Sequence, residues 1–510
     1  MQKKSLIFFI LKLIKMPLTI LTLALTAKYF GVGIDKDVWL LALGAVTMID
    51  LAIWGPVNET FRSRFVLMKE TEGEEKSFKD VQSLLFYIFI FSILLTVFLE
   101  LFPHLLARLI APSYNEEDLL KLVTMIRILA PFLLVNQFIL ISTSILNAYE
   151  KFYIPEIASF VSQIINLILI VFFADILGIN SLAIALYISS FLLIGFLIYQ
   201  FKKEKINLFQ QSFPNFSGFR KFFFYAIPCF IPYFIGQISG TIERTLATEL
   251  GKGVVSIVDF SRKIPEMLNG ILITVVLTIL VPVLTKAFAN KEESKYEAEF
   301  LSSYKLGLFG LVAFITFFIN GSDPILNLLY SSKSISENDM SSIILLSKFF
   351  AISLLGVYSY IVFGMSMLSV DKGKLYAGYG SMAQILLIVI NFTLIKKVGI
   401  IIFPISYFIS HFIAAIFMYS NYPYDKKPIL KTFFKYIIFG TACVIISSYL
   451  FHSIPKIHFN TAFSQQIYSI CISICISILI LAFFGYIFRI GELMKFYSLI
   501  KNKLKRNKNA

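Results

Sequence analysis

Long apolar stretches follow one another almost without interruption from Leu6 to Phe488. Each is about as long as the ~20 residues that a helix needs to cross the hydrocarbon core of a bilayer. The stretches are apolar on all sides rather than alternating, which favours transmembrane helices over the strands of a β-barrel. The pattern predicts fourteen transmembrane helices, at residues 6–30, 38–60, 81–110, 122–148, 156–177, 181–201, 221–247, 254–285, 299–320, 342–369, 375–395, 399–420, 431–452 and 465–489.

A weak internal repeat relates two parts of the chain. LTAKYFGVG (25–33) in the first predicted hairpin corresponds to LATELGKG (246–253) between the seventh and eighth spans, and LNAYEKFYIP (146–155) corresponds to LSVDKGKLYAG (368–378). The offset is six helices, an even number, so the two halves have the same orientation in the membrane. The predicted fold class is therefore an all-α polytopic membrane protein with two six-helix bundles in a parallel pseudo-repeat plus two C-terminal helices.

This repeat also predicts the domain organisation. The predicted limits are 1–205 for the N-terminal bundle, 206–422 for the C-terminal bundle, 423–492 for helices 13 and 14, and 493–510 for a basic cytoplasmic tail.

The distribution of basic residues predicts the orientation of the helices in the membrane. The chain is 57% hydrophobic with a formal net charge of +15. Most of the Lys and Arg residues between the spans fall on one side of the membrane, which argues against nucleic acid as a partner. The positive-inside rule puts both termini in the cytoplasm. The tail from Lys495 to Lys508 either lies against anionic lipid headgroups or only marks the topology.

The polar segments exclude several functional classes. None is long enough for a catalytic domain, and we find no nucleophile–base pair, Gly-rich phosphate loop, metal-ligand spacing or ATP site. We therefore expect no enzyme and no cofactor, with energy from a Na⁺ or H⁺ gradient or from the membrane potential. The four cysteines all lie in apolar spans and are interpreted as packing residues: Cys229, Cys443, Cys471 and Cys475.

Charged residues inside the spans are the candidate site. Such residues cost about 2.5–3.5 kcal/mol each at a helix centre, so they usually face a cavity or a partner. Here they gather in the leading hairpin of each half, namely at Lys12, Lys15, Asp50, Glu243, Arg244, Asp259, Arg262, Lys263 and Glu266.

Arg262 is the strongest candidate among them. Asp259, Arg262 and Glu266 are spaced i, i+3, i+7 and share one helix face, whereas Lys263 points roughly 100° away from Arg262. A guanidinium holds a phosphate through two parallel hydrogen bonds and does not lose its charge. The alternative is an internal ion pair of Arg262 with Asp259 or Glu266. Lys12 and Lys15 either add charge for the same anion or are anchors that reach the membrane surface.

Lone polar residues in other spans are weaker candidates. His411 is interpreted as a candidate proton carrier and Asn391 as a candidate contributor to a cation site. The alternative for both is hydrogen bonding between helices, the commoner role of such residues.

Several motifs resemble those of the MurJ (MviN) family, the lipid II flippases of the multidrug/oligosaccharidyl-lipid/polysaccharide exporter superfamily. AKYFGVGIDKD (27–37) is similar to that family's turn after the first helix, and SILNAYEKFYIP (144–155) to its LNA signature. IRILAPFLL (126–134), DFSRKIPEM (259–267) and LVPVLTKAF (280–288) are similar to three further blocks. The resemblance covers about residues 1–420.

The resemblance implies a location in the bacterial inner membrane, a fold, a substrate and site residues. It implies two six-helix bundles around a central cavity lined by helices 1, 2, 7 and 8, and alternating access for a lipid-linked disaccharide-pentapeptide pyrophosphate. Arg262 matches the family's cavity arginine of helix 8, and Asp37 matches the acid of the turn. The family's other cavity arginines are absent, since Thr22 and Met16 stand at the helix 1 positions and Asp50 marks the helix 2 position.

The leading hypothesis is a flippase for a polyprenyl-pyrophosphate-linked saccharide, lipid II first, that serves peptidoglycan synthesis. The expected partners are that lipid-linked glycan, membrane lipids and other envelope-synthesis proteins. The alternatives are a flippase for another lipid-linked polysaccharide unit, a cation-coupled multidrug exporter of the same superfamily, and an assembly scaffold.

Overall fold

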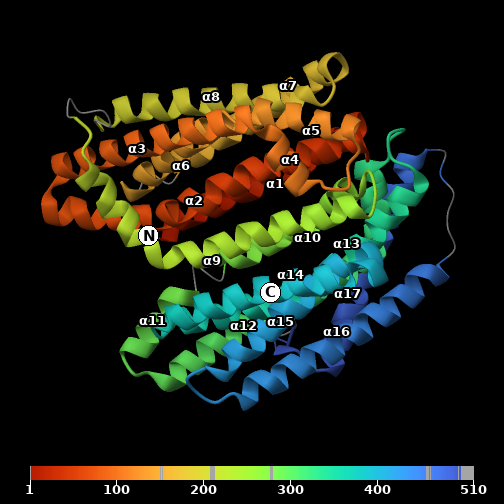
Figure 1. The fold of residues 1–510 in the computed structure, drawn as a ribbon. Helices are drawn as coiled ribbons and strands as arrows, with labels where there is room; N and C mark the ends of the chain where they lie inside the picture. The colour runs from red at the N-terminus through yellow and green to blue at the C-terminus, as the bar shows by residue number, and fades with distance from the viewer. Residues whose placement is uncertain are drawn as a thin grey trace, which may run out of the picture. The chain divides into compact units, whose positions relative to one another are not determined.

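The computed structural model describes residues 2–149, 151, 153–206, 213–275, 280–454, 459, 461–491 and 493–494, without the side chains of residues 2–13 and 272–275. The described residues form helices joined by turns (Figure 1). They divide into two compact units, one of Met1–Ile257 with Ser332–Ser336 and one of Val258–Ser331 with Glu337–Ala510. The domain limits drawn from the sequence repeat stay predictions.

The first unit contains the helices from the N-terminus to the start of α10. Asn115 and Asn215 begin two of them, because each side chain accepts a hydrogen bond from a backbone N–H three residues later. The helices are α1 (Gln2–Phe30), α2 (Ile34–Glu72), α3 (Glu74–Leu101), α4 (Pro103–Ile110), α5 (Glu116–Leu129), α6 (Phe132–Ala148), α7 (Tyr153–Leu177), α8 (Asn180–Lys203) and α9 (Phe216–Glu249).

Helix α2 is the centre of the first unit. It packs against α5, α6 and α9, and more than half of its most apolar stretch is buried. Phe61 on α2 stacks on Phe65 and on Phe222 of α9, with ring centroids 5.7 and 5.2 Å apart. Such stacks add to the energy of burying the rings, so they fix α9 against α2.

The second unit contains the rest of α10 (Val254–Val275) and the helices that follow it. These are α11 (Val281–Ala289), α12 (Glu293–Tyr330), α13 (Glu337–Ser369), α14 (Gly373–Val398), α15 (Ile402–Ser420), α16 (Lys427–Ser453) and α17 (Ala462–Ile487). Helix α13 packs against α15 and α12, and α12 also packs against α16 and α17.

Buried tyrosines join α12 to α13 in the second unit. The hydroxyl of Tyr296 lies 2.8 Å from the hydroxyl oxygens of both Ser366 and Ser369, and Tyr358 donates to the carbonyl of Ser303 at 3.0 Å. Lipid offers no partner to a polar group, so hydrogen bonds between helices satisfy these hydroxyls. They fix the register of the two helices as well as holding them together.

The described helices support fewer separate spans than the fourteen predicted. Ten are long and apolar enough to cross a membrane, or eleven if α5 and α6 together make one span. Gly373–Ser420 is one of the ten, although α14 packs against α15 and Gly399 between them has a φ of +68°. The chain therefore turns back there, as the predicted pair 375–395 and 399–420 requires. Helix α10 is not among the ten, and it carries four charged residues, Asp259 to Glu266.

Two predicted spans are broken in the structure. The span predicted at 122–148 is α5 and α6, which meet at Pro131 with a bend of 43°. The span predicted at 81–110 is α3 and α4, which separate at Phe102 just before Pro103. Proline lacks the N–H that would continue a helix, so each break lies next to one. Both stretches remain apolar across the break, which is why hydropathy alone joins them.

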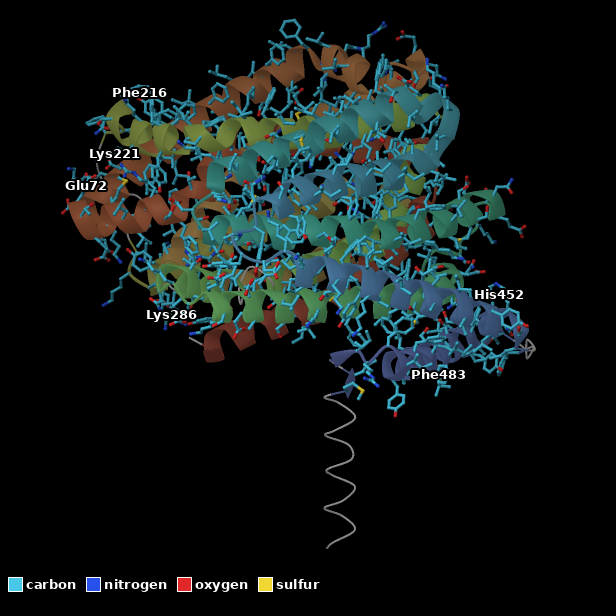
Figure 2. All side chains as sticks on the ribbon, turned by 90° about the horizontal axis from the view of Figure 1, so that it is seen from below. Glu72, Phe216, Lys221, Lys286, His452 and Phe483 are labelled. Carbon is cyan, nitrogen blue, oxygen red and sulfur yellow. The ribbon has the colours of Figure 1, made fainter. Side chains whose placement is uncertain are left out.

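Large apolar side chains lie on the outside of the helices. Phe483 on α17 is 60% exposed and points away from its neighbours in Figure 2, and Phe172 on α7 is 69% exposed. In water such a surface would promote aggregation, whereas in a bilayer it faces lipid. The structure is therefore that of an all-helical polytopic membrane protein.

Candidate functional site

Four charged residues of α10 form two ion pairs along the helix in the second unit. Nζ of Lys263 lies 2.9 Å from Oδ1 of Asp259, and Nε of Arg262 lies 3.8 Å from Oε1 of Glu266. Both pairs are spaced i, i+4, the spacing at which helical side chains meet. Lys263 therefore reaches Asp259, which lies one turn earlier on α10. Glu266 is thus one partner of Arg262 within its own helix.

Arg262 keeps the features of an anion-binding group within these contacts. A separation of 3.8 Å is too long for a hydrogen bond, so Glu266 attracts the guanidinium without occupying its donors. The Glu266 side chain is 51% exposed and that of Arg262 is 23% exposed. The guanidinium also stacks on the ring of Phe350 on α13, 5.0 Å from its centroid. Aromatic stacking restricts the arginine's rotamers and so orients its donors.

Asp37 holds the beginning of α10 in the first unit. Its side chain is fully buried, with Oδ2 accepting from the N–H of Gly253 at 2.6 Å and Oδ1 from the N–H and the hydroxyl of Ser256. A carboxylate at a helix N-terminus satisfies donors that have no partner within the helix and complements the helix dipole. This geometry is structural, and substrate binding by Asp37 stays a prediction.

Asp50 lies in a polar network between α2 and α6. Its two carboxylate oxygens accept from Asn136 at 2.6 Å and from Gln137 at 2.8 Å, and Asn58 donates to the amide oxygen of Gln137 at 3.2 Å. Asp50 is only 2% exposed. Its two partners lie just after the block 126–134, and the sequence does not link them to Asp50.

Glu243 and Arg244 lie near the end of α9, where α9 packs against α2. Glu243 is buried, and the guanidinium of Arg244 lies directly over Gly44 of α2. A Cβ at position 44 would be 2.4 Å from Nη1 of Arg244. The absence of a side chain at Gly44 is therefore what admits the arginine. Sequence reasoning did not select Gly44, and a glycine in the middle of a predicted span is the only signal for it.

Lys15 pairs with Glu156 between α1 and α7. Both side chains are less than one fifth exposed, so the lysine's charge is largely neutralised. Glu156 was not selected from the sequence because it begins a span rather than lying inside one. Lys12 belongs to α1, but its side chain lies outside the described residues.

Asn391 and His411 lie on the packed helices α14 and α15. Asn391 is fully buried, and within the described residues neither its amide nitrogen nor its oxygen has a hydrogen-bond partner. Nδ1 of His411 lies 2.9 Å from the carbonyl oxygen of Tyr407, and the ring has edge contacts with Tyr360 and Tyr407. His411 is thus held by packing within the unit, whereas a buried amide without a partner calls for a ligand or a water. Cation coupling by either residue stays a prediction.

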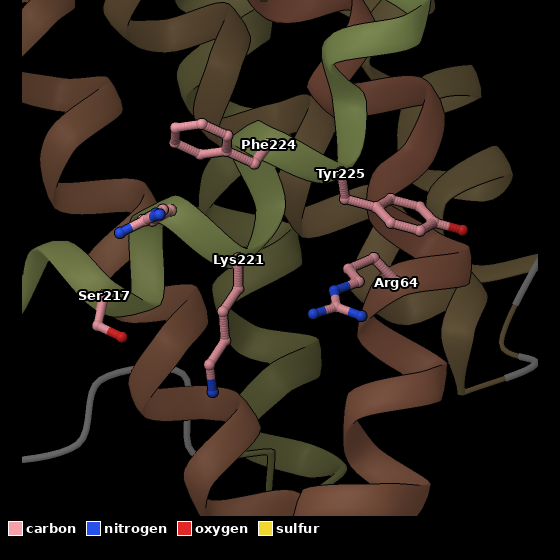
Figure 3. A pocket seen from close by; sticks show the side chains of 6 residues that line it. Arg64, Ser217, Lys221, Phe224 and Tyr225 are labelled. Atoms are coloured by element: carbon pink, nitrogen blue, oxygen red, sulfur yellow. The ribbon is translucent and has the colours of Figure 1, made fainter.

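A basic pocket of about 540 Å³ lies where α2 ends and α9 begins (Figure 3). Lys221 pairs with Glu72 at 2.6 Å and with Asp80 at 2.8 Å. Lys221 and Glu72 are labelled next to each other in Figure 2. The guanidinium groups of Arg64 and Arg220 stack on rings of α9, at 5.4 and 5.0 Å from the centroids. The lysine is therefore neutralised, and the pocket ties α9 to α2 and α3.

Metal chemistry has no support in the part of the chain that the structure describes. No group of three or more His, Cys, Asp or Glu side chains lies close enough to hold an ion there. Cys471 and Cys475 are exposed on α17, Cys443 is buried and Cys229 is half-buried.

Comparisons with known proteins agree on one family. A family model described as lipid II flippase MurJ matches residues 26–470. A probable lipid II flippase MurJ of Buchnera aphidicola subsp. Baizongia pistaciae is 24% identical over 343 residues, which cover 65% of this chain and 66% of that protein. The lipid II flippase MurJ of Burkholderia cenocepacia is 24% identical over 182 residues, which cover 34% and 35% of the two chains. The matched parts thus span less than two thirds of these relatives' own lengths.

Solved structures agree on the fold. A lipid II flippase MurJ in an inward closed conformation superposes with a TM-score of 0.77 at 19% identity, over 94% of this chain and 99% of that one. A multidrug resistance MATE family transporter of the MOP superfamily, in an inward-facing conformation, superposes with a TM-score of 0.68 at 14% identity, over 85% and 98%. The family is one of flippase transporters rather than enzymes, as the sequence predicts. Because the family model matches most of its length, this chain belongs to the MurJ family of lipid II flippases.

Proposed function

We propose that this chain moves a polyprenyl-pyrophosphate-linked saccharide, lipid II first, from the cytoplasmic to the outer leaflet by alternating access. The transported lipid would supply peptidoglycan synthesis. Family membership supports the class of activity, and the basic residues between the spans support a cytoplasmic location of both termini.

The observation that carries the proposal is the state of Arg262. It is a permanently charged side chain that is oriented by the ring of Phe350 and lies 3.8 Å from the exposed carboxylate of Glu266. A pyrophosphate can replace such a carboxylate, because a guanidinium binds phosphate oxygens through two parallel hydrogen bonds. The two phosphates of the carrier lipid are common to every substrate of this class, so Arg262 would recognise the carrier rather than the sugar.

One observation favours a second substrate in the same class. The cationic groups proposed to assist Arg262 are few, because Lys15 is neutralised by Glu156 and Lys263 by Asp259. A flippase for another polyprenyl-linked polysaccharide unit needs the pyrophosphate contact but fewer further cations. The likeness to a MATE family transporter shows the fold alone and adds no support for drug export.

Transport by purified protein in proteoliposomes tests the proposal. We expect Arg262→Ala to lower the rate of fluorescent lipid II translocation at least tenfold, because a lost charged hydrogen bond is worth about 1.5–3 kcal/mol. Arg262→Lys should be intermediate, since it keeps the charge but not the paired donors. Arg108→Ala is the matched control, because Arg108 is also paired with a glutamate but both side chains are largely exposed.

Two results would contradict the proposal. Full transport by Arg262→Ala would show that Arg262 makes no necessary contact with the pyrophosphate. Absence of transport by the wild-type protein for lipid II and for other polyprenyl-linked glycans would leave a scaffold as the function.

A further inference from the structure

A second basic pocket lies within the C-terminal unit, far along the chain from Arg262. It has a volume of about 620 Å³ and is formed by α12, by the beginning of α16 and by the residues that follow α17. We call it the C-terminal basic pocket. Its charged lining residues are Lys305, Lys431, Lys435 and Arg489. The three helices pack against one another, so the pocket is a fixed feature of this unit.

The charges of the C-terminal basic pocket are not balanced. No carboxylate is among its described lining residues, and neither Lys305 nor Lys431 has an ion pair or hydrogen bond in the part of the chain that the structure describes. Lys435 donates to the backbone carbonyl of Arg489 at 3.0 Å, which brings two of the cations together. Glu492 follows closely in the sequence, but one carboxylate cannot neutralise both Lys305 and Lys431. Like charges gathered in a region of low dielectric favour a bound anion.

Two of these lysines lie inside long helices. Lys305 lies in about the fourth turn of α12 and Lys435 in about the third turn of α16. Both helices are apolar enough to span a membrane, and charged residues inside such helices usually face a cavity or a partner. The sequence contains this signal, because both residues fall inside predicted spans, yet only the fold brings them into one pocket.

An apolar stripe on α16 leads away from the C-terminal basic pocket. Lys431, Phe434, Ile438 and Ile445 are spaced i, i+3, i+7, i+14 and therefore share one face. The three apolar residues are 54%, 58% and 62% exposed. An anion held at Lys431 thus has a lipid-facing track directly beside it. This arrangement fits a lipid headgroup, because the acyl chains of a lipid can cover the apolar stripe, whereas a free phosphate ion cannot.

We infer that the C-terminal basic pocket binds the phosphate of an anionic phospholipid whose acyl chains lie along α16. The lipid belongs to the leaflet at the beginning of α16, which the basic residues predict to be cytoplasmic. Bound there, it fastens α16 and α17, the helices outside the internal repeat, to α12. The inference does not depend on the proposed transport activity, since Arg262 is not part of the pocket.

Lipid binding by the full-length purified protein tests the inference. Native mass spectrometry would count bound lipid, and thermal unfolding in detergent would be titrated with phosphatidylglycerol or with phosphatidylcholine. We expect phosphatidylglycerol to bind and to raise the unfolding temperature, and phosphatidylcholine to do neither. Lys305→Gln/Lys431→Gln should weaken phosphatidylglycerol binding about 30-fold, because each lysine near an anionic headgroup contributes about fivefold.

Matched variants separate the pocket from general charge. Lys286→Gln/Lys374→Gln removes the same charge from exposed residues outside the pocket and should bind like the wild type. Lys305→Arg/Lys431→Arg keeps the charge and should retain binding. If the double glutamine variant does not fold, Lys431→Gln alone changes only an exposed side chain and should weaken binding by several-fold.

Three outcomes would overturn the inference. The first is equal binding of phosphatidylglycerol by the pocket variants and by the Lys286/Lys374 control. The second is equal binding of the two lipids by the wild type. The third is stabilisation by inorganic phosphate or glycerol phosphate as large as that by the lipid at the same concentration, which would mean an anion site without lipid recognition.

Discussion

Single residues decide how closely the helices of the first unit approach each other. Gly44 admits the guanidinium of Arg244, and Gly55 on the same helix admits the ring of Tyr233, to which a Cβ would come within 2.6 Å. Both contacts join α2 to α9. Small residues that let helices approach are a common device in membranes, where apolar burial does not drive association. At Gly44 the missing side chain also makes room for a charged group, the guanidinium of Arg244.

Gly44→Ala should therefore destabilise the protein. The new methyl group must displace the guanidinium or separate α2 from α9, and overpacking of this kind costs about 1–3 kcal/mol. Thermal unfolding in detergent would show a fall of several degrees. Gly195→Ala is the control, because the space around Gly195 on α8 is open and alanine favours helix. Equal unfolding temperatures for the two variants would contradict the close approach.

The sequence pattern identified charged residues that have partners better than it identified the partners themselves. The rule that charges inside spans face a cavity or partner selected Asp50 and Arg262, which both have polar partners, and their role in substrate binding stays a prediction. It did not find Gln137 or Glu156, because amides and residues at span ends carry no such penalty. Local spacing did predict a pair for Arg262, since i, i+4 neighbours meet without any tertiary information.

Among the elements, α10 depends on a residue from another helix for its first turn. Asp37 of α2 accepts hydrogen bonds from both Gly253 and Ser256, so it acts as a cap supplied from a distance in sequence. The backbone of Gly253 has a φ of +84°, a conformation that a side chain would strain. Capping by Asp37 and the glycine together set where α10, the helix of Arg262, begins.

Replacing Asp37 separates capping from substrate binding. Asp37→Ala should destabilise the protein by about 2 kcal/mol or more, because it removes a cap and leaves buried donors without partners. Asp37→Asn keeps one acceptor and should lie between Asp37→Ala and the wild type. Asp35→Ala is the control, since Asp35 is exposed and only loosely paired with Lys121. If Asp37→Asn loses lipid transport while its unfolding temperature matches the wild type, Asp37 is a binding residue and not a cap.

Element boundaries were predictable only where the apolar pattern stops. The limits of α7, α8 and α16 agree with the predicted spans to within several residues, because polar loops flank them. The breaks at Phe102 and Pro131 lie inside apolar stretches and need the geometry of proline. Pro228, Pro232 and Pro265, by contrast, lie within the continuous helices α9 and α10, so proline in the sequence does not by itself end a helix here.

For the whole molecule, the sequence predicted the class and the family because both depend on summed features. Hydropathy over hundreds of residues and the order of short motifs remain recognisable even between relatives that are only 24% identical. Sites made by residues from several helices, such as the C-terminal basic pocket, depend on packing that no local pattern encodes. The orientation in the membrane depends on another sum, the distribution of basic residues, and so it can be tested separately from the fold.

Helix α14 offers a compact test of that orientation. Lys374 and Lys397 are exposed near its opposite ends, and the positive-inside rule places Lys374 in the cytoplasm and Lys397 outside. In a variant without the four native cysteines, Lys397→Cys should react with a membrane-impermeant maleimide in intact cells, whereas Lys374→Cys should react only after permeabilisation. Both cysteines should label equally in detergent, which controls for reactivity. The reverse pattern in intact cells would place both termini outside and would put the C-terminal basic pocket in the outer leaflet, because the beginnings of α14 and α16 are predicted on the same side.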